Sequence, residues 1–157
     1  QLAARDNGLT PFVSMQNHYN PFYREDEREL IPVCKQMNVV LTPYSPLAAG
    51  RAARPDWAAD TLRSCTDVVA QGKYDSTEEA DKLIAGRIYA LARKYETSMT
   101  AITFAWHFKK GIAAPIIGAT KAKYLDDVVR AFDVTLTDED VACLDEAYVP
   151  HKIVGAL

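Results

Sequence analysis

Three short segments of the sequence carry residue types that suit a nucleotide-binding site. The first ends at Gln16, the second is residues 44–50 (YSPLAAG), and the third is residues 118–121 (GATK). An aromatic ring can stack on a planar heterocycle, a side-chain amide can pair with a carboxamide, and a glycine-rich turn leaves backbone N–H groups open to phosphate oxygens. These chemistries together predict a bound nucleotide, although the sequence has neither a Walker loop nor a GxGxxG motif.

Each of these signals also has an ordinary structural explanation. Gln16 could satisfy a loop, Tyr44 could pack in the core, and Thr120 could cap a helix. His18 could act as an acid or base near neutral pH, but the sequence shows no fixed partner for it. Cys34 lies on an apolar helix stripe and is interpreted as an unreactive core thiol. No single residue therefore decides between a binding site and a structural role.

The strands and helices that must position these segments alternate along the chain. Short apolar runs with β-branched residues predict strands at 11–16, 39–44 and 113–117. Helical periodicity and helix-end residues predict helices at 24–37, 76–95, 100–110, 123–132 and 137–148. Residues 51–75 lack clean periodicity and are predicted to form a long loop or lid, with some helix near 58–70.

Several helix starts are predicted from individual residues. Ser76 with Glu79, and Thr137 with Asp140, have the spacing of capping boxes, and Thr100 is expected to open a helix of its own. In the helix predicted at 24–37, Pro32 allows either a regular start near Glu29 or a kink.

The alternation is typical of an α/β protein with parallel strands. In such folds, ligand-binding groups collect at the carboxyl ends of the strands. Those ends are residues 16–20, 44–50 and 118–121. The fold prediction and the residue chemistry therefore point to the same three segments.

Composition limits the class of protein. The 157 residues are 48% apolar with a net charge of −3, which predicts one domain, residues 1–157, with its own core. Without a basic surface we expect no nucleic-acid partner and no membrane partner, and no apolar run reaches the roughly 18 residues of a membrane span. Three widely spaced cysteines predict reduced thiols rather than disulfides or a metal site. We therefore expect a cytoplasmic protein.

At the same three segments the sequence resembles the aldo-keto reductase superfamily. The matching stretches are residues 12–20 (FVSMQNHYN), 24–51 (REDERELIPVCKQMNVVLTPYSPLAAGR), 115–132 (PIIGATKAKYLDDVVRAF) and 136–148 (LTDEDVACLDEAY). They resemble the sixth, seventh and eighth strands of the family's barrel with the helices that follow, and they keep the family's order and spacing.

The resemblance implies a parallel (β/α)8 TIM barrel, of which this chain supplies roughly the carboxyl-terminal half, three strands plus helices. It also implies an oxidoreductase that uses NADPH to reduce aldehydes or ketones by hydride transfer. The implied cofactor-binding residues are Gln16 for the nicotinamide carboxamide, Tyr44 for stacking on the nicotinamide, Ser45, Leu47 and Gly50 along the pyrophosphate, Gly118, Ala119, Thr120 and Lys121 around the 2′-phosphate, and Asp127 facing the adenine amino group.

The sequence departs from the family pattern in two places. Val128 stands where the family commonly has an asparagine that contacts the adenine. The family's catalytic Asp, Tyr, Lys and His belong to segments that would precede Gln1, so no catalytic residue is assigned here. The isolated chain is therefore predicted to be inactive, since it lacks the positioned acid that proton transfer needs.

The predicted partners follow from the same resemblance. They are a small carbonyl substrate and either the missing amino-terminal half of the barrel or a second copy of the chain, because strands taken from a closed barrel leave their edges unpaired. A non-enzymatic, nucleotide-binding regulatory subunit of the channel-associated type is the alternative function. A free-standing interaction domain that binds no nucleotide is a third hypothesis.

Overall fold

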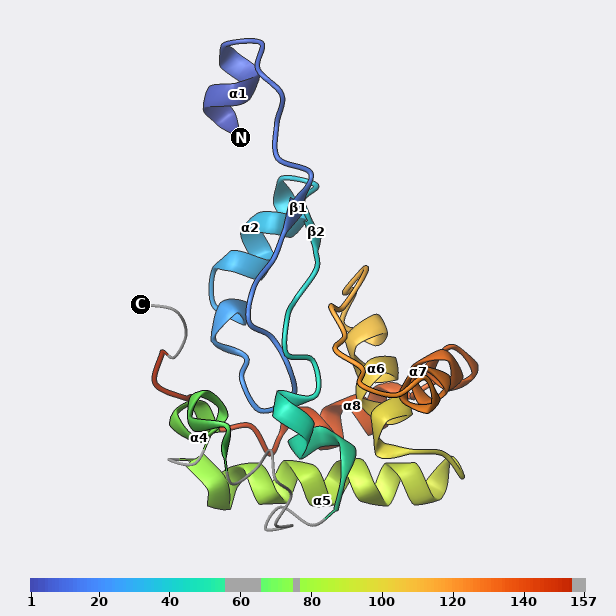
Figure 1. Ribbon diagram of the computed structural model, residues 1–157. Coiled ribbons are helices and arrows are strands. Elements are labelled where there is room, and N and C mark those ends of the chain that lie inside the picture. Colours follow the sequence, from blue (N-terminus) through green and yellow to red (C-terminus); the bar gives the residue numbers. More distant parts are fainter. Residues whose placement is uncertain (56–65, 75–76, 154–157) are drawn as a thin grey trace.

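The computed structural model describes residues 1–55, 66–74 and 77–153. Its elements are α1 (Leu2–Asp6), β1 (Ser14–Met15), η1 (Glu25–Glu27), α2 (Leu30–Gln36), β2 (Val40–Leu41), η2 (Ala48–Ala53), α4 (Val68–Tyr74), α5 (Glu78–Lys94), α6 (Met99–Lys109), α7 (Lys123–Val129), η4 (Arg130–Asp133) and α8 (Asp138–Asp145). Figure 1 shows α5 along one end of the molecule, with α6, α7 and α8 close to it. The two strands and α2 extend from these helices, and α1 lies at the far end.

The two strands form a parallel pair joined by α2, as the alternation predicted. Ser14 pairs with Val40 and Met15 with Leu41. The ladder continues past the strands, since Tyr44 N donates to the Asn17 carbonyl oxygen at 2.8 Å. It ends at an isolated parallel bridge between His18 and Tyr44. The carboxyl ends of both strands therefore lie side by side.

The predicted third strand, residues 113–117, is not a strand in the part of the chain that the structure describes. The segment lies beside β2 in parallel order: Ala114 N donates to the Leu41 carbonyl oxygen at 3.5 Å and Ile116 N to that of Pro43 at 2.8 Å. The bond expected between these two would run from the N–H of residue 43 to the Ala114 carbonyl oxygen, but Pro43 has no N–H, and a ladder of two bonds is too short for a regular strand. The expected strand is thus replaced by an extended segment in the same place.

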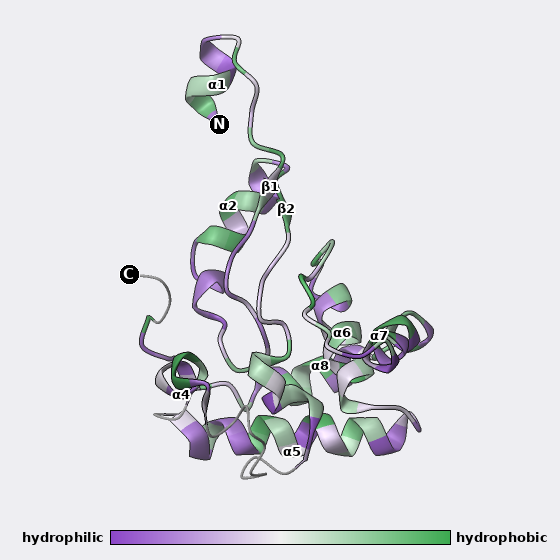
Figure 2. Cartoon of the chain, in the orientation of Figure 1, coloured by the Kyte–Doolittle hydropathy of each residue, from purple (hydrophilic) through white to green (hydrophobic). Residues whose placement is uncertain are grey.

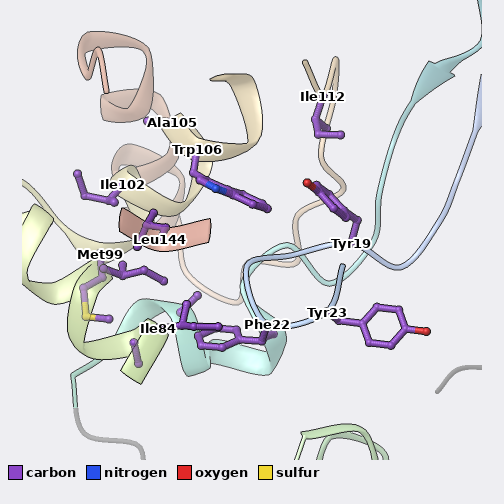
Figure 3. Close-up of a cluster of buried hydrophobic side chains, with 14 of the residues drawn as sticks. Tyr19, Phe22, Tyr23, Ile84, Met99, Ile102, Ala105, Trp106, Ile112 and Leu144 are labelled. Atoms are coloured by element: carbon purple, nitrogen blue, oxygen red, sulfur yellow. The ribbon is translucent and has the colours of Figure 1, made fainter. Parts of the chain in front are cut away.

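The hydrophobic core lies among the helices and the loop after β1 rather than on the sheet. Tyr19 and Phe22 from that loop meet Ile84 of α5, Trp106 of α6 and Leu144 of α8 (Figure 3). Apolar residues of α5 recur along one side of the helix, and Figure 2 shows polar residues between them. This alternation is the pattern of a helix with one face in the core.

The sheet is less buried than its apolar sequence predicted. Leu41 is buried, but Val40 is 48% exposed and Val13 is 70% exposed. Adjacent residues of a strand point to opposite faces, and α2 covers only one face of this pair. Val40, which points away from Leu41, therefore lies on the uncovered face.

Two predicted helix starts agree with the structure. Thr137 and Asp140 form the expected capping box at the start of α8. The helix expected over residues 24–37 is a 3₁₀ turn, η1, followed by α2, which starts at Leu30 with Glu29 as the N-cap. Pro32 then falls in the first helical turn, where its missing N–H costs nothing. No kink at Pro32 is needed to explain the described chain.

One other predicted start is wrong, and one alternative role does not occur in the structure. The N-cap of α6 is Ser98, whose Oγ accepts from Ala101 N at 3.1 Å, and Thr100 lies within the first turn. Thr120 is not a cap either, because α7 begins at Lys123 with Ala122 at the N-cap position. Short polar side chains cap helices equally well from neighbouring positions, so spacing alone did not select the correct residue.

Part of the predicted lid lies outside the described residues, as does Ser76 of the first predicted capping box. The described part of residues 51–75 contains the end of η2 and the whole of α4. The helix that follows starts at Glu78 with Thr77 as its N-cap. Among the described residues, no helix combines the length and apolar character needed to cross a bilayer.

Ion pairs fasten the loop after β1 to α8. Arg24 is 7% exposed, and its guanidinium contacts Glu27 and Asp145, each at 2.7 Å. Trp106 Nε1 donates to the same Asp145 carboxylate at 3.1 Å. A buried charge is tolerated only when it is paired in this way. The loop that leads from the end of β1 is therefore held in one place.

Candidate functional site

A groove joins two of the three segments singled out in the sequence. It has a volume of about 330 Å³ and is lined by Ser45, Leu47 and Gly50 from the turn after β2 and by Gly118 and Ile116 from the extended segment beside it. Four of the predicted cofactor-binding residues thus meet in one groove, although Gly118 is distant from the others in sequence. The hydrogen bond between Ile116 and Pro43 holds the two walls together.

The turn that forms one wall has an unusual backbone. Positive φ angles occur at Ser45 (56°), Ala48 (48°), Ala49 (56°) and Gly50 (95°). Such angles are strained for residues other than glycine and collect at functional sites. Two backbone hydrogen bonds within the turn, Ala48 N to Ser45 O at 3.0 Å and Gly50 N to Leu47 O at 2.8 Å, hold the shape.

The glycines on the two walls border open space. A Cβ built on Gly50 or Gly118 would meet no other atom within 4 Å. Gly50 also has a φ angle of 95°, which glycine adopts without strain. The backbone at both glycines is therefore uncovered beside the groove.

Tyr44 stands beside the groove as one member of an aromatic stack. Its ring is nearly parallel to that of His18, with centroids 5.0 Å apart, and His18 stacks in turn on Tyr23 at 4.3 Å. Tyr44 is half-buried, whereas His18 and Tyr23 are buried. The parallel bridge between residues 18 and 44 explains the stack, since bridged residues point to the same face.

The helix α4 contributes two residues that the sequence did not single out. Tyr74 is 1% exposed, and its hydroxyl lies 2.8 Å from His18 Nε2 and 3.0 Å from Asn20 Nδ2. The Lys73 ammonium lies over the Tyr44 ring, 5.0 Å from the centroid. No sequence signal marked either residue, because both lie in the stretch without helical periodicity.

Neither tyrosine hydroxyl of the site is acidic. Burial raises the pKa of Tyr44, and the negative charge of Asp26 raises it further. Burial also raises the pKa of Tyr74 to about 12, although hydrogen bonds with Ser45 and Asn20 act in the opposite direction. Both hydroxyls stay protonated at neutral pH and are poor proton donors to a reacting group.

The remaining predicted residues are at the edge of the site or on exposed surfaces. Gln16 follows β1 directly and is exposed, and residues 119–121 continue from the groove as an exposed segment. Asp127 lies on α7, where its carboxylate pairs with Arg130 at 3.2 Å. Val128, at the departure from the family pattern, packs beside a small cluster around Phe104.

The sequence profile of the Aldo/keto reductase family matches residues 1–149. The chain belongs to the aldo/keto reductase family. It is 40% identical over 154 residues to versiconal hemiacetal acetate reductase of Aspergillus parasiticus, covering 98% of this chain and 45% of that protein. It is 39% identical over 150 residues to an aldo-keto reductase of Alternaria alternata, covering 94% of this chain and 40% of the relative. The chain thus spans less than half the length of these relatives.

Solved structures support the fold of this aldo/keto reductase chain. The glycerol dehydrogenase of Gluconobacter oxydans superposes with a TM-score of 0.74 at 24% identity, over 96% of this chain and 47% of that one. A variant of Gox0644 solved with NADPH superposes with a TM-score of 0.66 at 18% identity, over 98% of this chain and 44% of that one. The described chain is therefore a partial α/β unit of the fold that these reductases share, as the resemblance implied.

Proposed function

We propose that this chain forms the NADP(H)-binding part of an oxidoreductase that reduces aldehydes or ketones. The observation that carries the proposal is the groove itself, where Ser45, Leu47 and Gly50 face Gly118 across open space. The donor chemistry of the neighbouring residues fits a dinucleotide, with an aromatic ring, an amide and a lysine beside a glycine-containing turn. The family supports the oxidoreductase class.

Each residue near the groove has a separate task in this proposal. Tyr44 offers its ring to the nicotinamide, and the exposed Gln16 amide holds the carboxamide. The turn containing Ser45, Leu47 and Gly50 lies along the pyrophosphate. Beyond the groove, Ala119, Thr120 and Lys121 follow Gly118 around the 2′-phosphate, and Asp127 faces the adenine. When bound, NADPH supplies the hydride that reduces the carbonyl carbon.

The proton for that reduction comes from outside the described site. The raised pKa values of Tyr44 and Tyr74 make both poor general acids. General acid catalysis contributes roughly 10²–10⁴-fold to such reactions. In our proposal the 157-residue chain therefore binds cofactor but turns over carbonyl substrates negligibly by itself.

A reducing, cytoplasmic location suits this proposal. Cys34 and Cys143 are free thiols, and Cys34 is buried. Burial raises the pKa of the Cys34 thiol, with a further rise from the charge of Asp26. A buried thiol of raised pKa is unreactive, which agrees with its interpretation as a core residue.

Titration with NADPH, followed by its fluorescence, tests the proposed cofactor site. Gly118→Leu places a side chain into the open space beside the groove, and we expect it to weaken NADPH binding at least about tenfold by displacing the ligand, equivalent to about 1.4 kcal/mol. Gly86→Leu is the matched control, because Gly86 is an exposed residue of α5 whose added Cβ also meets nothing within 4 Å. Absence of NADPH binding to the unaltered chain, or equal binding by the two variants, would overturn the proposal.

A further inference from the structure

The Tyr44 ring already has two neighbours. His18 stacks on it with an interplanar angle of 13°, and the Lys73 ammonium lies over it. The near-parallel imidazole takes one face of the ring, and the Lys73 ammonium lies 5.0 Å from the ring centroid. A planar ligand ring that stacks on Tyr44 would therefore bind close to the Lys73 ammonium.

Lys73 cannot move far from this position, because the neighbouring residue anchors α4. The Tyr74 side chain is buried, and its hydroxyl lies within hydrogen-bonding distance of His18 and Asn20. The Arg51 guanidinium also lies over the Tyr74 ring, 5.0 Å from its centroid. These contacts fix the backbone from which the Lys73 side chain extends, so the ammonium remains tethered beside the Tyr44 ring.

Among the described residues, the Lys73 ammonium has no carboxylate partner. Within the described residues, no carboxylate lies within 4.0 Å of the Lys73 ammonium. The Asp26 carboxylate, whose charge reaches Tyr44, accepts a hydrogen bond from Asn17 Nδ2 at 2.8 Å. A lysine is cationic at neutral pH, so the platform has a positive charge beside it.

The two redox forms of a nicotinamide cofactor respond differently to such a charge. The oxidised ring is a cation and the reduced ring is neutral, while the pyrophosphate, the adenine and the 2′-phosphate are common to both. The electron-rich Tyr44 ring attracts a cationic ring more than a neutral one, so a preference for the reduced form has to come from the charge of Lys73. At a distance of several ångströms near a protein surface, repulsion between two such charges changes binding by about tenfold.

We propose that Lys73 is a specificity-determining residue that makes the Tyr44 platform prefer the neutral, reduced nicotinamide to the cationic, oxidised one. The proposal rests on the NADP(H) site proposed above. In this proposal α4 helps to select the redox form of the cofactor, because the charge of Lys73 favours binding of the reduced form. The site is thereby biased toward carbonyl reduction.

Calorimetric titration of the 157-residue chain with NADPH and with NADP⁺ tests this assignment. The measured quantity is the ratio of the two dissociation constants. We expect Lys73→Met to lower the preference for NADPH about tenfold, mainly through tighter NADP⁺ binding, and Lys73→Gln to do the same. Lys73→Arg keeps the charge and should keep the preference. Lys35→Met, on the exposed side of α2, is the matched control and should change nothing.

The ratio separates selectivity from a general contact or a folding defect. If Lys73→Met and Lys73→Gln change both affinities equally, or leave both unchanged, Lys73 has no role in selecting the redox form and this proposal is wrong, while the cofactor site stands. If the unaltered chain binds neither form, the proposed function fails and this assignment fails with it. Circular dichroism of each variant confirms that the comparison is between folded chains.

Discussion

At the scale of single residues, replacement of Lys121 tests whether the proposed phosphate end of the site distinguishes NADPH from NADH. It is exposed and follows directly from the groove residue Gly118. A lysine beside a phosphate dianion contributes a charge-assisted hydrogen bond. We therefore expect Lys121→Met to weaken NADPH binding about tenfold and to leave NADH binding unchanged, because NADH lacks the 2′-phosphate.

Fluorescence titration with the two cofactors measures this difference. Lys35→Met again serves as the control for removal of one exposed lysine. An equal loss of affinity for NADH and NADPH would show that Lys121 does not read the 2′-phosphate. Because the role proposed for Lys73 concerns the nicotinamide and that proposed for Lys121 the phosphate, the two variants should have independent effects.

At the scale of elements, Asp140 joins the start of α8 to the end of α5. It completes the capping box with Thr137, accepts from Lys94 Nζ at 2.6 Å and is hydrogen-bonded by the Tyr95 hydroxyl. Burial would raise the pKa of Asp140, but the hydrogen bonds from Lys94 and Tyr95 outweigh it and lower the pKa to about 2. Asp140 is therefore charged at all physiological pH values.

The lowered pKa predicts how Asp140→Asn affects stability. The carboxyl of Asp140 in the unfolded chain has a pKa of about 3.9. The stabilisation that the Asp140 carboxylate gives the folded chain is therefore fully present above that pH and is lost as the pH falls toward 2. Because Lys94 is half exposed, we expect a loss of only about 1–2 kcal/mol in the free energy of unfolding at pH 7. Urea unfolding of the unaltered chain and of Asp140→Asn, at pH values from 7 to 3, measures this loss. A difference in the free energy of unfolding that did not shrink with falling pH would contradict the lowered pKa of Asp140.

At the scale of the whole molecule, exposed apolar side chains lie on both faces of the strand pair and of the segment before it, beside an open strand edge. Phe12 is 78% exposed, Val13 is 70% exposed and Val40 is 48% exposed. A groove of about 280 Å³, lined by Phe12, Met15, Val33 and Val39, continues this surface. Exposed apolar patches beside an open strand edge favour association with another chain.

In a solution of this chain alone, the available partner is a second copy. We therefore expect sedimentation velocity to show a species heavier than the 17.4 kDa chain, and Val13→Lys to shift it toward the monomer by placing charge on the apolar surface. Leu83→Lys, at a 53% exposed position on α5, is the matched control. A concentration-independent monomer for the unaltered chain would rule out this self-association.

Local features of this protein were readable from neighbouring residues. The Thr137 and Asp140 capping box and the parallel strands joined by α2 were predicted from spacing and residue type, and the position of Pro32 in a first helical turn was one of two alternatives. Residues 113–117 were predicted wrongly as a strand, because a strand also needs a regular partner ladder and Pro43, beside this segment, cannot supply one of the N–H groups. The same limit applied to Thr100 and Thr120, since several nearby residues can cap one helix.

The sequence by itself determined the family, the βαβ order and the turn residues that border the groove. Only the tertiary structure decided that Ser45 and Gly118 face each other, that His18 stacks on Tyr44, and that α4 brings Lys73 over the Tyr44 ring. Turns and caps depend on a few adjacent residues, whose preferences the sequence records. Contacts between distant segments depend on how the core around Tyr19, Ile84 and Trp106 packs, and packing is a property of the whole chain.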